Sequence, residues 1–162
     1  MFIAHLPAGY IATVLSRKKW PSKTASSWFA VASCVGSVAP DFDLIYYYVW
    51  DKQQHHHHGY WTHYPIIWFP LLVFMLLLIK LFPRFHKPFI CMAVFFFSGC
   101  VHLLLDTVVG DIWWGAPFID KSFSLFYVPA IFSPWWLNFI LHWSFLLELI
   151  IVFIAIRLWR QS

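Results

Sequence analysis

The stretch PFICMAVFFFSGCVHLLLD, residues 88–106, is apolar for almost its whole length and ends in a histidine and an aspartate. An α-helix needs about 20 mostly apolar residues to cross a bilayer, so a helix over Pro88–Val109 is long enough to lie in a membrane. Because a helical turn takes 3.6 residues, His102 and Asp106 share one face. Polar side chains are costly within a membrane and usually functional there. The stretch therefore predicts a membrane helix that carries two side chains of the metal-binding type.

The composition of the whole chain is that of a membrane protein. Apolar residues make up 61% of the sequence and charged residues 11%, whereas soluble domains carry about 25% charged residues. The 11 Trp and seven Tyr are residue types that gather at membrane–water interfaces. The net charge of +4 is small and scattered, which argues against a nucleic-acid partner. Cys34, Cys91 and Cys100 lack CxxC spacing, and we expect them to be small buried hydrophobes.

Apolar runs bounded by prolines predict an all-α, polytopic bundle of about five helices, formed by a single membrane-embedded domain over residues 1–162. The expected segments are Ile3–Ser16, Thr24–Ala39, His63–Phe82, Pro88–Val109 and Pro134–Trp159. The first two are short, so both full and re-entrant spans fit them. The connections at 40–62 and 110–133 are long, and ordered loops of such length are usually functional.

The basic residues are distributed unevenly between the two sides that these segments define. If each segment crosses, nine of the 11 basic residues share one side: Arg17, Lys18, Lys19, Lys23, Lys80, Arg84, Lys87, Arg157 and Arg160. Only Lys52 and Lys121 remain on the other. The positive-inside rule makes the basic side cytoplasmic, with the N-terminus outside and the C-terminus in the cytoplasm. We therefore expect an integral protein of a bacterial inner (plasma) membrane.

Histidines and aspartates far apart in the sequence all fall toward the outer side. The candidate metal ligands are His5, Asp41, His63, His102 and Asp106, and two further candidates, Asp43 and His58, lie beside them. Imidazole nitrogen and carboxylate oxygen suit zinc, manganese or iron. Each element also has a plainer interpretation: a helix cap, a turn, a solvated histidine run at 55–58, or a buried hydrogen-bonded pair. Thr62 is a plausible N-cap, with His63 at the start of the third helix.

The motifs HLPAGY, APDFD, HHGYWTHYP and HLLLDTVVGDIWWGAPF, in this order, resemble the motif series of the YdjM-like family of predicted membrane-bound metal-dependent hydrolases. The resemblance covers about residues 5–118. It implies an N-terminal histidine, a PDxD turn and an HxxxD helix that together hold a metal. The sequence departs from the pattern at His58, where the family usually has Arg, and at Tyr64, where it usually has Ser.

A more distant similarity concerns the order of the ligands. Zinc-dependent phospholipase C and the P1-type nucleases also place an N-terminal His, an Asp and a His before an HxxxD helix. The similarity implies one or two divalent ions, zinc before manganese. Asp41, His63 and His102 would hold one ion, His5 would help to hold the other, and Asp106 would bridge them.

Those enzymes have a further zinc site, for which this chain offers only His142 and Glu148. Six residues separate the two, which places them on different helix faces. We expect this site to be missing or altered.

Together these observations predict a membrane-embedded metal-dependent hydrolase. We expect a phosphoester of a lipid or lipid-linked substrate to be cleaved at the outer interface, with Asp43 or His58 orienting water, shuttling a proton or supporting a ligating histidine. Four tryptophans would flank the substrate: Trp113, Trp114, Trp135 and Trp136. A transporter of metal ions or protons and a non-catalytic membrane scaffold are the alternatives. Transport fits less well, because the polar residues cluster on one side and no inverted repeat is present.

Overall fold

The computed structural model describes residues 3–19 and 26–161, so the expected helix start at Thr24 and the charge of Lys23 lie outside the described residues. The helices are α1 (His5–Lys19), α2 (Ser26–Gly36), α3 (Asp43–Val49), α4 (Pro65–Leu81), α5 (His86–Asp106), α6 (Trp136–Ile140) and α7 (Ser144–Arg160). Short 3-10 turns are η1 (Pro40–Phe42), η2 (His57–Gly59), η3 (Trp61–His63) and η4 (Pro83–Phe85). Within the described ranges the only β-type pairing is a single bridge between Ile112 and Phe123. The predicted all-α class is confirmed.

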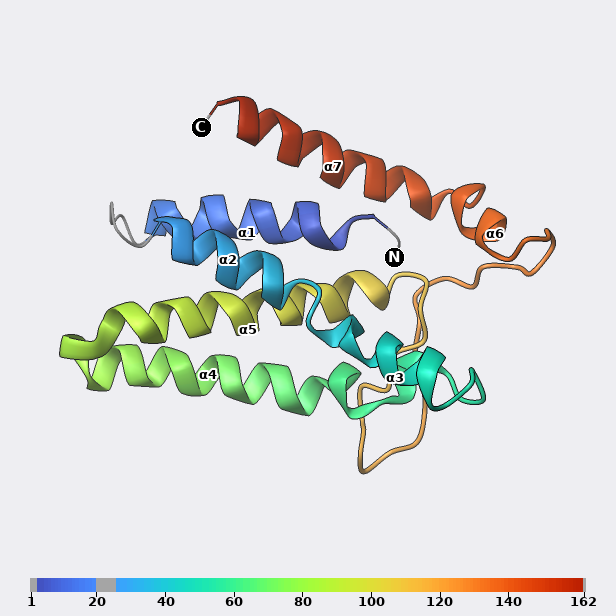
Figure 1. Cartoon of the computed structure of the whole chain (residues 1–162), viewed down its shortest axis with the longest axis horizontal. Coiled ribbons are helices and arrows are strands. Elements are labelled where there is room, and N and C mark those ends of the chain that lie inside the picture. Colours follow the sequence, from blue (N-terminus) through green and yellow to red (C-terminus); the bar gives the residue numbers. More distant parts are fainter. Residues whose placement is uncertain (1–2, 20–25, 162) are drawn as a thin grey trace.

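The five longest helices lie side by side and alternate in direction (Figure 1). Helix α4 packs on α5, α2 and α1 pack on α5 and on each other, and α7 packs on α1. The start of α1, the ends of α2 and α5 and the start of α4 therefore meet at one end of the bundle, together with α3 and the segment that follows α5. The opposite end holds the ends of α1 and α7 and the turn between α4 and α5.

The expected helix ends differ from the observed ones by one to three residues, and the last expected helix is divided. Two of these differences have a clear local cause. Helix α4 begins at Pro65 rather than at His63, because Pro favours the first helical position and forces Tyr64 before it into extended backbone, with ψ 121°. His63 instead ends η3. The last expected segment is two helices, α6 and α7, separated at His142. The His142 ring there pairs with the Ser144 hydroxyl at 2.8 Å and accepts the Ser144 N–H at 3.3 Å.

Small polar residues bring α1, α2 and α5 close together. The Ser33 hydroxyl donates to the Gly9 carbonyl at 2.5 Å and also bonds the Ser98 hydroxyl at 2.8 Å. A Cβ on Gly36 would lie 2.2 Å from the Phe95 carbonyl oxygen, so the backbones of α2 and α5 nearly touch there. Small residues have the same role between membrane helices generally, where they permit close backbone contact.

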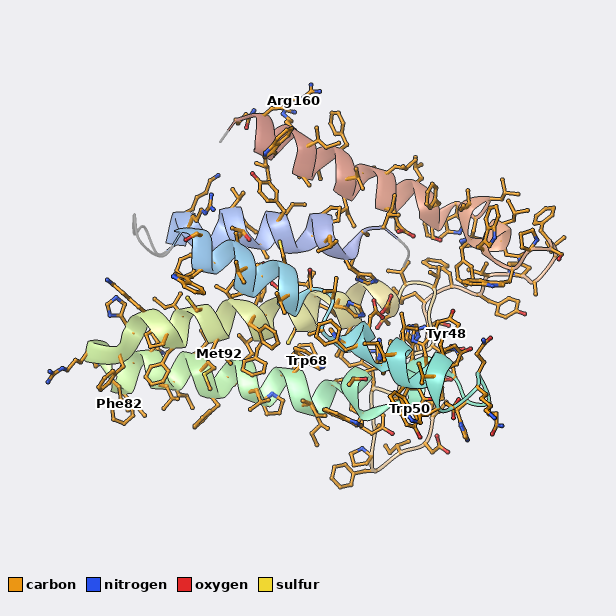
Figure 2. The ribbon with its side chains drawn as sticks, in the orientation of Figure 1. Tyr48, Trp50, Trp68, Phe82, Met92 and Arg160 are labelled. Carbon is orange, nitrogen blue, oxygen red and sulfur yellow. The ribbon has the colours of Figure 1, made fainter. Side chains whose placement is uncertain are left out.

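On the other side of α5, large apolar side chains fill the contact with α4. Trp68 lies between the two helices, where Figure 2 labels it, and its ring would be 2.0 Å from a Cβ on Gly99. Its neighbours in this core include Phe96, Cys100 and Leu103. The α4–α5 hairpin is therefore held by packing of an aromatic ring against a residue without a side chain.

Among the described residues, one helical stretch, Pro83–Asp106, is long and apolar enough by itself to cross a membrane, with a mean hydropathy of 2.1. The segments Ser27–Gly36 and Pro40–Val49 meet this criterion only together, and they are bent by 57°. Helix α4 is apolar but shorter. Large apolar side chains are exposed along α4 and α7, among them Phe74, Leu77, Phe153 and Trp159, and a lipid environment would cover them.

Candidate metal centre

The helix contact at Gly9, Ser33 and Ser98 positions the polar residues one helical turn further along. His5 precedes Gly9 by four residues, whereas Ser37 and His102 follow Ser33 and Ser98 by four. The three residues therefore meet in the next layer. There the His102 Nδ1–H donates to the Ser37 carbonyl at 2.7 Å, and the His5 and His102 rings stack with centroids 3.9 Å apart.

Four side chains from three parts of the chain converge in this layer. Donor atoms of Asp41, His63, His102 and Asp106 all lie within 4.8 Å of one another. The His102 Nε2 lies 2.9 Å from Asp106 Oδ2 and 3.5 Å from Asp41 Oδ1. The His63 Nε2 lies 3.5 Å from the same Asp41 oxygen and 3.9 Å from Asp106 Oδ2. All four residues are buried except Asp41, which is partly exposed.

The outer nitrogens of His63 and His102 fix the orientation of both rings. A carboxylate and a carbonyl only accept hydrogen bonds, so His63 Nδ1–H donates to Asp43 Oδ2 at 2.6 Å as His102 Nδ1–H donates to Ser37. In the neutral rings, each Nε2 then presents a lone pair to the carboxylates. Within the described residues neither Nε2 makes a hydrogen bond of good geometry, although the His102 Nε2 lies only 2.9 Å from Asp106 Oδ2. Lone pairs and carboxylate oxygens that face one another in a buried site fit a cation between them, and this support of ligating histidines is usual at metal sites.

Two more imidazoles approach Asp106. The His5 Nε2 lies 3.2 Å from Asp106 Oδ1, and the His58 Nε2 lies 3.6 Å from Asp106 Oδ2. Glu148 of α7 holds the start of α1 beside His5, because its Oε2 accepts the N–H groups of Ile3 and Ala4 at 2.6 and 3.2 Å. A carboxylate at a helix N-terminus is favourable, so Glu148 helps to fix His5.

The histidine run at 55–58 divides into an outer and an inner half. His55 is exposed and bonds Asp51 at 2.6 Å, and His56 is also exposed, whereas His57 is half-buried and His58 is buried. Burial lowers the pKa of His57 to about 4 and holds the pKa of His58 well below its usual range. Both shifts favour the neutral ring, which is the form that binds metals.

A cleft of about 700 Å³ opens beside this cluster. Asp41, His57, His58 and Asp106 form its inner wall. His63 lies behind this wall, fully buried, with Asp43 on its far nitrogen. Molecules in the cleft can therefore reach Asp41 and Asp106 without crossing the bundle.

The structure brings together every site residue that the sequence predicted. His5, Asp41, His58, His63 and His102 surround Asp106, as the distances above describe, and Asp43 reaches the cluster through His63. Thr62 is not the N-cap of α4, because Tyr64 occupies that position. The Thr62 hydroxyl instead donates to Asp43 Oδ2 at 2.5 Å.

Two groups at the cluster could not be predicted from the sequence: the ring of His57 on the cleft wall and the Ser37 carbonyl that accepts from His102. The histidine run next to Gly59 pointed to His57 but could not say which rings turn inward. Every residue has a backbone carbonyl, so the sequence does not show which one accepts a hydrogen bond from His102.

His142 and Glu148 have different hydrogen-bond partners. His142 bonds Ser144, and Glu148 caps the start of α1. Of the four tryptophans expected near the substrate, Trp135 lines the cleft. The indole N–H groups of Trp113 and Trp114 donate to Asp120 and Thr107, at 2.8 and 3.1 Å, and Trp136 is exposed at the start of α6.

The helical bundle, its apolar outer surface and the buried His/Asp cluster at one end define a class: a helical membrane protein with a candidate metal centre. The chain belongs to the YdjM inner membrane protein family, whose model matches residues 1–161. No curated protein and no solved structure matches the chain.

Loss of bound metal on mutation tests the cluster. We expect purified protein to carry about one or two divalent ions per chain. His102→Ala and the nearly isosteric Asp106→Asn should reduce this to background, because each removes a donor from the centre of the cluster. Elemental analysis of the detergent-purified protein measures the content, and circular dichroism checks that the helices persist. His86→Ala is the matched control, since His86 is exposed at the other end of the bundle. Metal-free, folded wild-type protein would refute the site.

The variant Asp43→Asn tests whether Asp43 orients the ligand His63 or binds the metal itself. The amide keeps the size of the side chain but removes the charge that orients His63. We expect metal affinity to fall about 10- to 100-fold, the usual cost of removing such a partner, with metal still bound at saturation. Titration against a chelator of known affinity measures the change. An unchanged dissociation constant would contradict the role of Asp43.

Proposed function

We propose that the protein is a membrane-embedded metal-dependent hydrolase that cleaves a phosphoester of a lipid or lipid-linked substrate at the outer membrane–water interface. The observation that carries the proposal is the convergence of Asp41, His63, His102 and Asp106 within 4.8 Å, with Asp41 and Asp106 on the wall of an open cleft and the two histidines behind that wall. A polar cluster with a purely structural role would not need to open onto a cleft.

The donor set suits zinc, with manganese as the alternative. A bound divalent ion supplies a hydroxide nucleophile near neutral pH and neutralises charge that develops on the phosphoester. Asp41, His63, His102 and Asp106 would hold the first ion. His5 lies beside Asp106 Oδ1 and His58 beside Asp106 Oδ2, so these two imidazoles would be the additional ligands if a second ion were bound.

Asp43, Ser37 and His58 would orient the ligating histidines and the attacking water. Asp43 and the Ser37 carbonyl keep His63 and His102 turned with Nε2 toward the carboxylates. If one ion were bound, His58, on the cleft wall beside Asp106, would be placed to accept a hydrogen bond from water. If two ions were bound, His58 would be a ligand. The metal count of the purified protein distinguishes these cases.

A lipid substrate is supported by the position of the cleft. The cleft lies at the end of the bundle, where α5 ends, and its outer residues are mainly aromatic. Apolar side chains are exposed on the adjoining helices, among them Leu6, Ile45 and Leu146. A lipid headgroup can therefore enter the cleft while its chains stay in the surrounding hydrocarbon.

We also propose that α1, α2, α4, α5 and α7 all cross the membrane, with the metal centre facing outward. The support is the distribution of charge: the bundle end opposite the cleft carries Arg17 and Lys18 of α1, the Lys80–Lys87 turn, and Arg157 and Arg160 of α7. Figure 2 labels Arg160 at that end and Tyr48 at the other. Basic residues favour the cytoplasmic side.

Cysteine labelling tests this orientation. In protein whose native cysteines are replaced by alanine, we expect Gln54→Cys to react with a membrane-impermeant maleimide in intact cells. Arg84→Cys, exposed at the basic end, should react only after the membrane is permeabilised. The reverse pattern would place the centre on the cytoplasmic side.

Hydrolysis of defined lipids tests the activity. Metal-loaded protein in mixed micelles should release phosphate or headgroup from phospholipid or polyprenyl phosphate, and chelation should stop the release. Asp106→Asn should lower kcat/KM by about 100-fold or more, because it weakens both the binding of the ion and the interactions that position the neighbouring histidines. His86→Ala should retain the parent rate. Failure to hydrolyse any lipid, together with metal uptake into proteoliposomes, would favour transport instead.

A further inference from the structure

The outer part of the cleft has a composition different from that of its inner wall. It is lined by the aromatic side chains Tyr47, Tyr48, Phe126, Tyr127, Trp135 and Phe139. One carboxylate, Asp111, lies among them, and no Lys or Arg is found among the described residues that line the cleft. A wall of this kind is suited to positive rather than negative charge.

Asp111 is held in place at this wall. Its Oδ1 accepts the Ser124 hydroxyl at 3.0 Å, and the neighbouring residues Ile112 and Phe123 exchange two backbone hydrogen bonds of 3.0 and 2.9 Å. Two more backbone bonds, from the N–H groups of Leu125 and Phe126 to the carbonyls of Thr107 and Val108, fasten the segment to the end of α5. The carboxylate is therefore part of the cleft wall, fixed by its backbone, rather than a mobile surface charge.

Asp111 is also close to the metal centre. The chain before it passes so near His58 that a Cβ on Gly110 would lie 2.6 Å from the His58 Cε1. The Tyr47 ring, which also lines the cleft, contacts the His57 ring edge-on with centroids 5.9 Å apart and the Tyr48 ring with centroids 5.0 Å apart. A group attached to a phosphate at Asp41 and Asp106 would thus lie in the same cleft as both the carboxylate and the tyrosines.

The charges decide between headgroups. An ion at the inner wall is already partly neutralised by Asp41 and Asp106, and it balances the substrate's own phosphate. A second anionic group would meet the negative Asp111 with no Lys or Arg side chain on the described cleft wall to offset it. An ammonium group would be attracted both by the carboxylate and by the faces of tyrosine and tryptophan rings.

We propose that Asp111, with Tyr47, Tyr48, Tyr127 and Trp135, forms a subsite for the ammonium group of the substrate's headgroup. The substrate class is then an aminoalcohol phosphodiester, such as the headgroup of phosphatidylethanolamine or phosphatidylcholine, rather than an anionic phospholipid or a polyprenyl phosphate. This inference rests on the proposed phosphoesterase function and specifies its substrate.

A comparison of lipids with identical acyl chains tests the subsite. We expect kcat/KM for phosphatidylethanolamine and phosphatidylcholine to exceed that for phosphatidylglycerol by about 10-fold or more, as one well-placed charge contact allows. Asp111→Asn should bring this ratio close to one, mainly by raising KM for the ammonium lipids. Asp120→Asn is the matched control, because Asp120 lies on the same segment but outside the cleft lining, where it accepts the Trp113 N–H.

Binding supplies a second measurement that does not depend on turnover. Calorimetry of the metal-loaded protein should show phosphoethanolamine binding more tightly than glycerol phosphate, and Asp111→Asn should remove the difference. Preference for phosphatidylglycerol or a polyprenyl phosphate, or an equal effect of Asp111→Asn on all lipids, would overturn the subsite and leave the hydrolase intact. Selective binding without hydrolysis of any lipid would instead overturn the phosphoesterase and leave the subsite. Loss of both would overturn both proposals.

Discussion

The hydroxyl of Ser33 holds the structure together at the point from which the site is built. It bonds the Gly9 carbonyl of α1 and the Ser98 hydroxyl of α5 at once, so three helices share one buried contact. Each such bond between membrane helices contributes about 0.6–2 kcal/mol. The contact also sets the geometry of the site, because regular helices that are close together at Ser33 are still close together one turn further along. His5 and His102 stack there for that reason, and the Ser37 carbonyl meets the His102 ring.

The cluster that results buries carboxylates against imidazole nitrogens, so it needs positive charge from a protonated histidine or a bound cation. Buried carboxylates are costly unless they are paired or coordinate a cation. A hydrogen bond on the side away from the cluster holds each histidine in place: His63 is held by Asp43 and His102 by the Ser37 carbonyl. Glu148 in turn holds the start of α1, which carries His5. Rigid support of this kind favours a site for an ion over a loose polar patch. It also explains why groups distant in sequence contribute to one centre.

Much of the fold and of the candidate site could be predicted from local pattern. The expected helix Pro88–Val109 is α5, and the spacing of His102 and Asp106 on it survives in the structure. The first two segments also match, apart from their ends. The expected boundaries differ most clearly at Pro65, where a proline starts the helix, and at His142, where a side-chain hydrogen bond interrupts an apolar run. The connection 40–62 contains α3 and three 3-10 turns, the last of which ends at His63, because these turns are fixed by contacts with one another and, for η1, with α5 rather than by periodicity.

The helical class, the membrane setting, the basic end and the set of ligand types could all be predicted from the sequence, because composition and a 3.6-residue period are local properties. Which of four consecutive histidines turn inward depends on the fold, and so does the arrangement in which Asp43 supports His63 while Asp41 faces the cleft. The fold also places Asp111 on an aromatic wall beside His58. Those choices depend on distances between segments up to a hundred residues apart. Such distances are set by the close contact of α1, α2 and α5, which no single stretch of sequence contains.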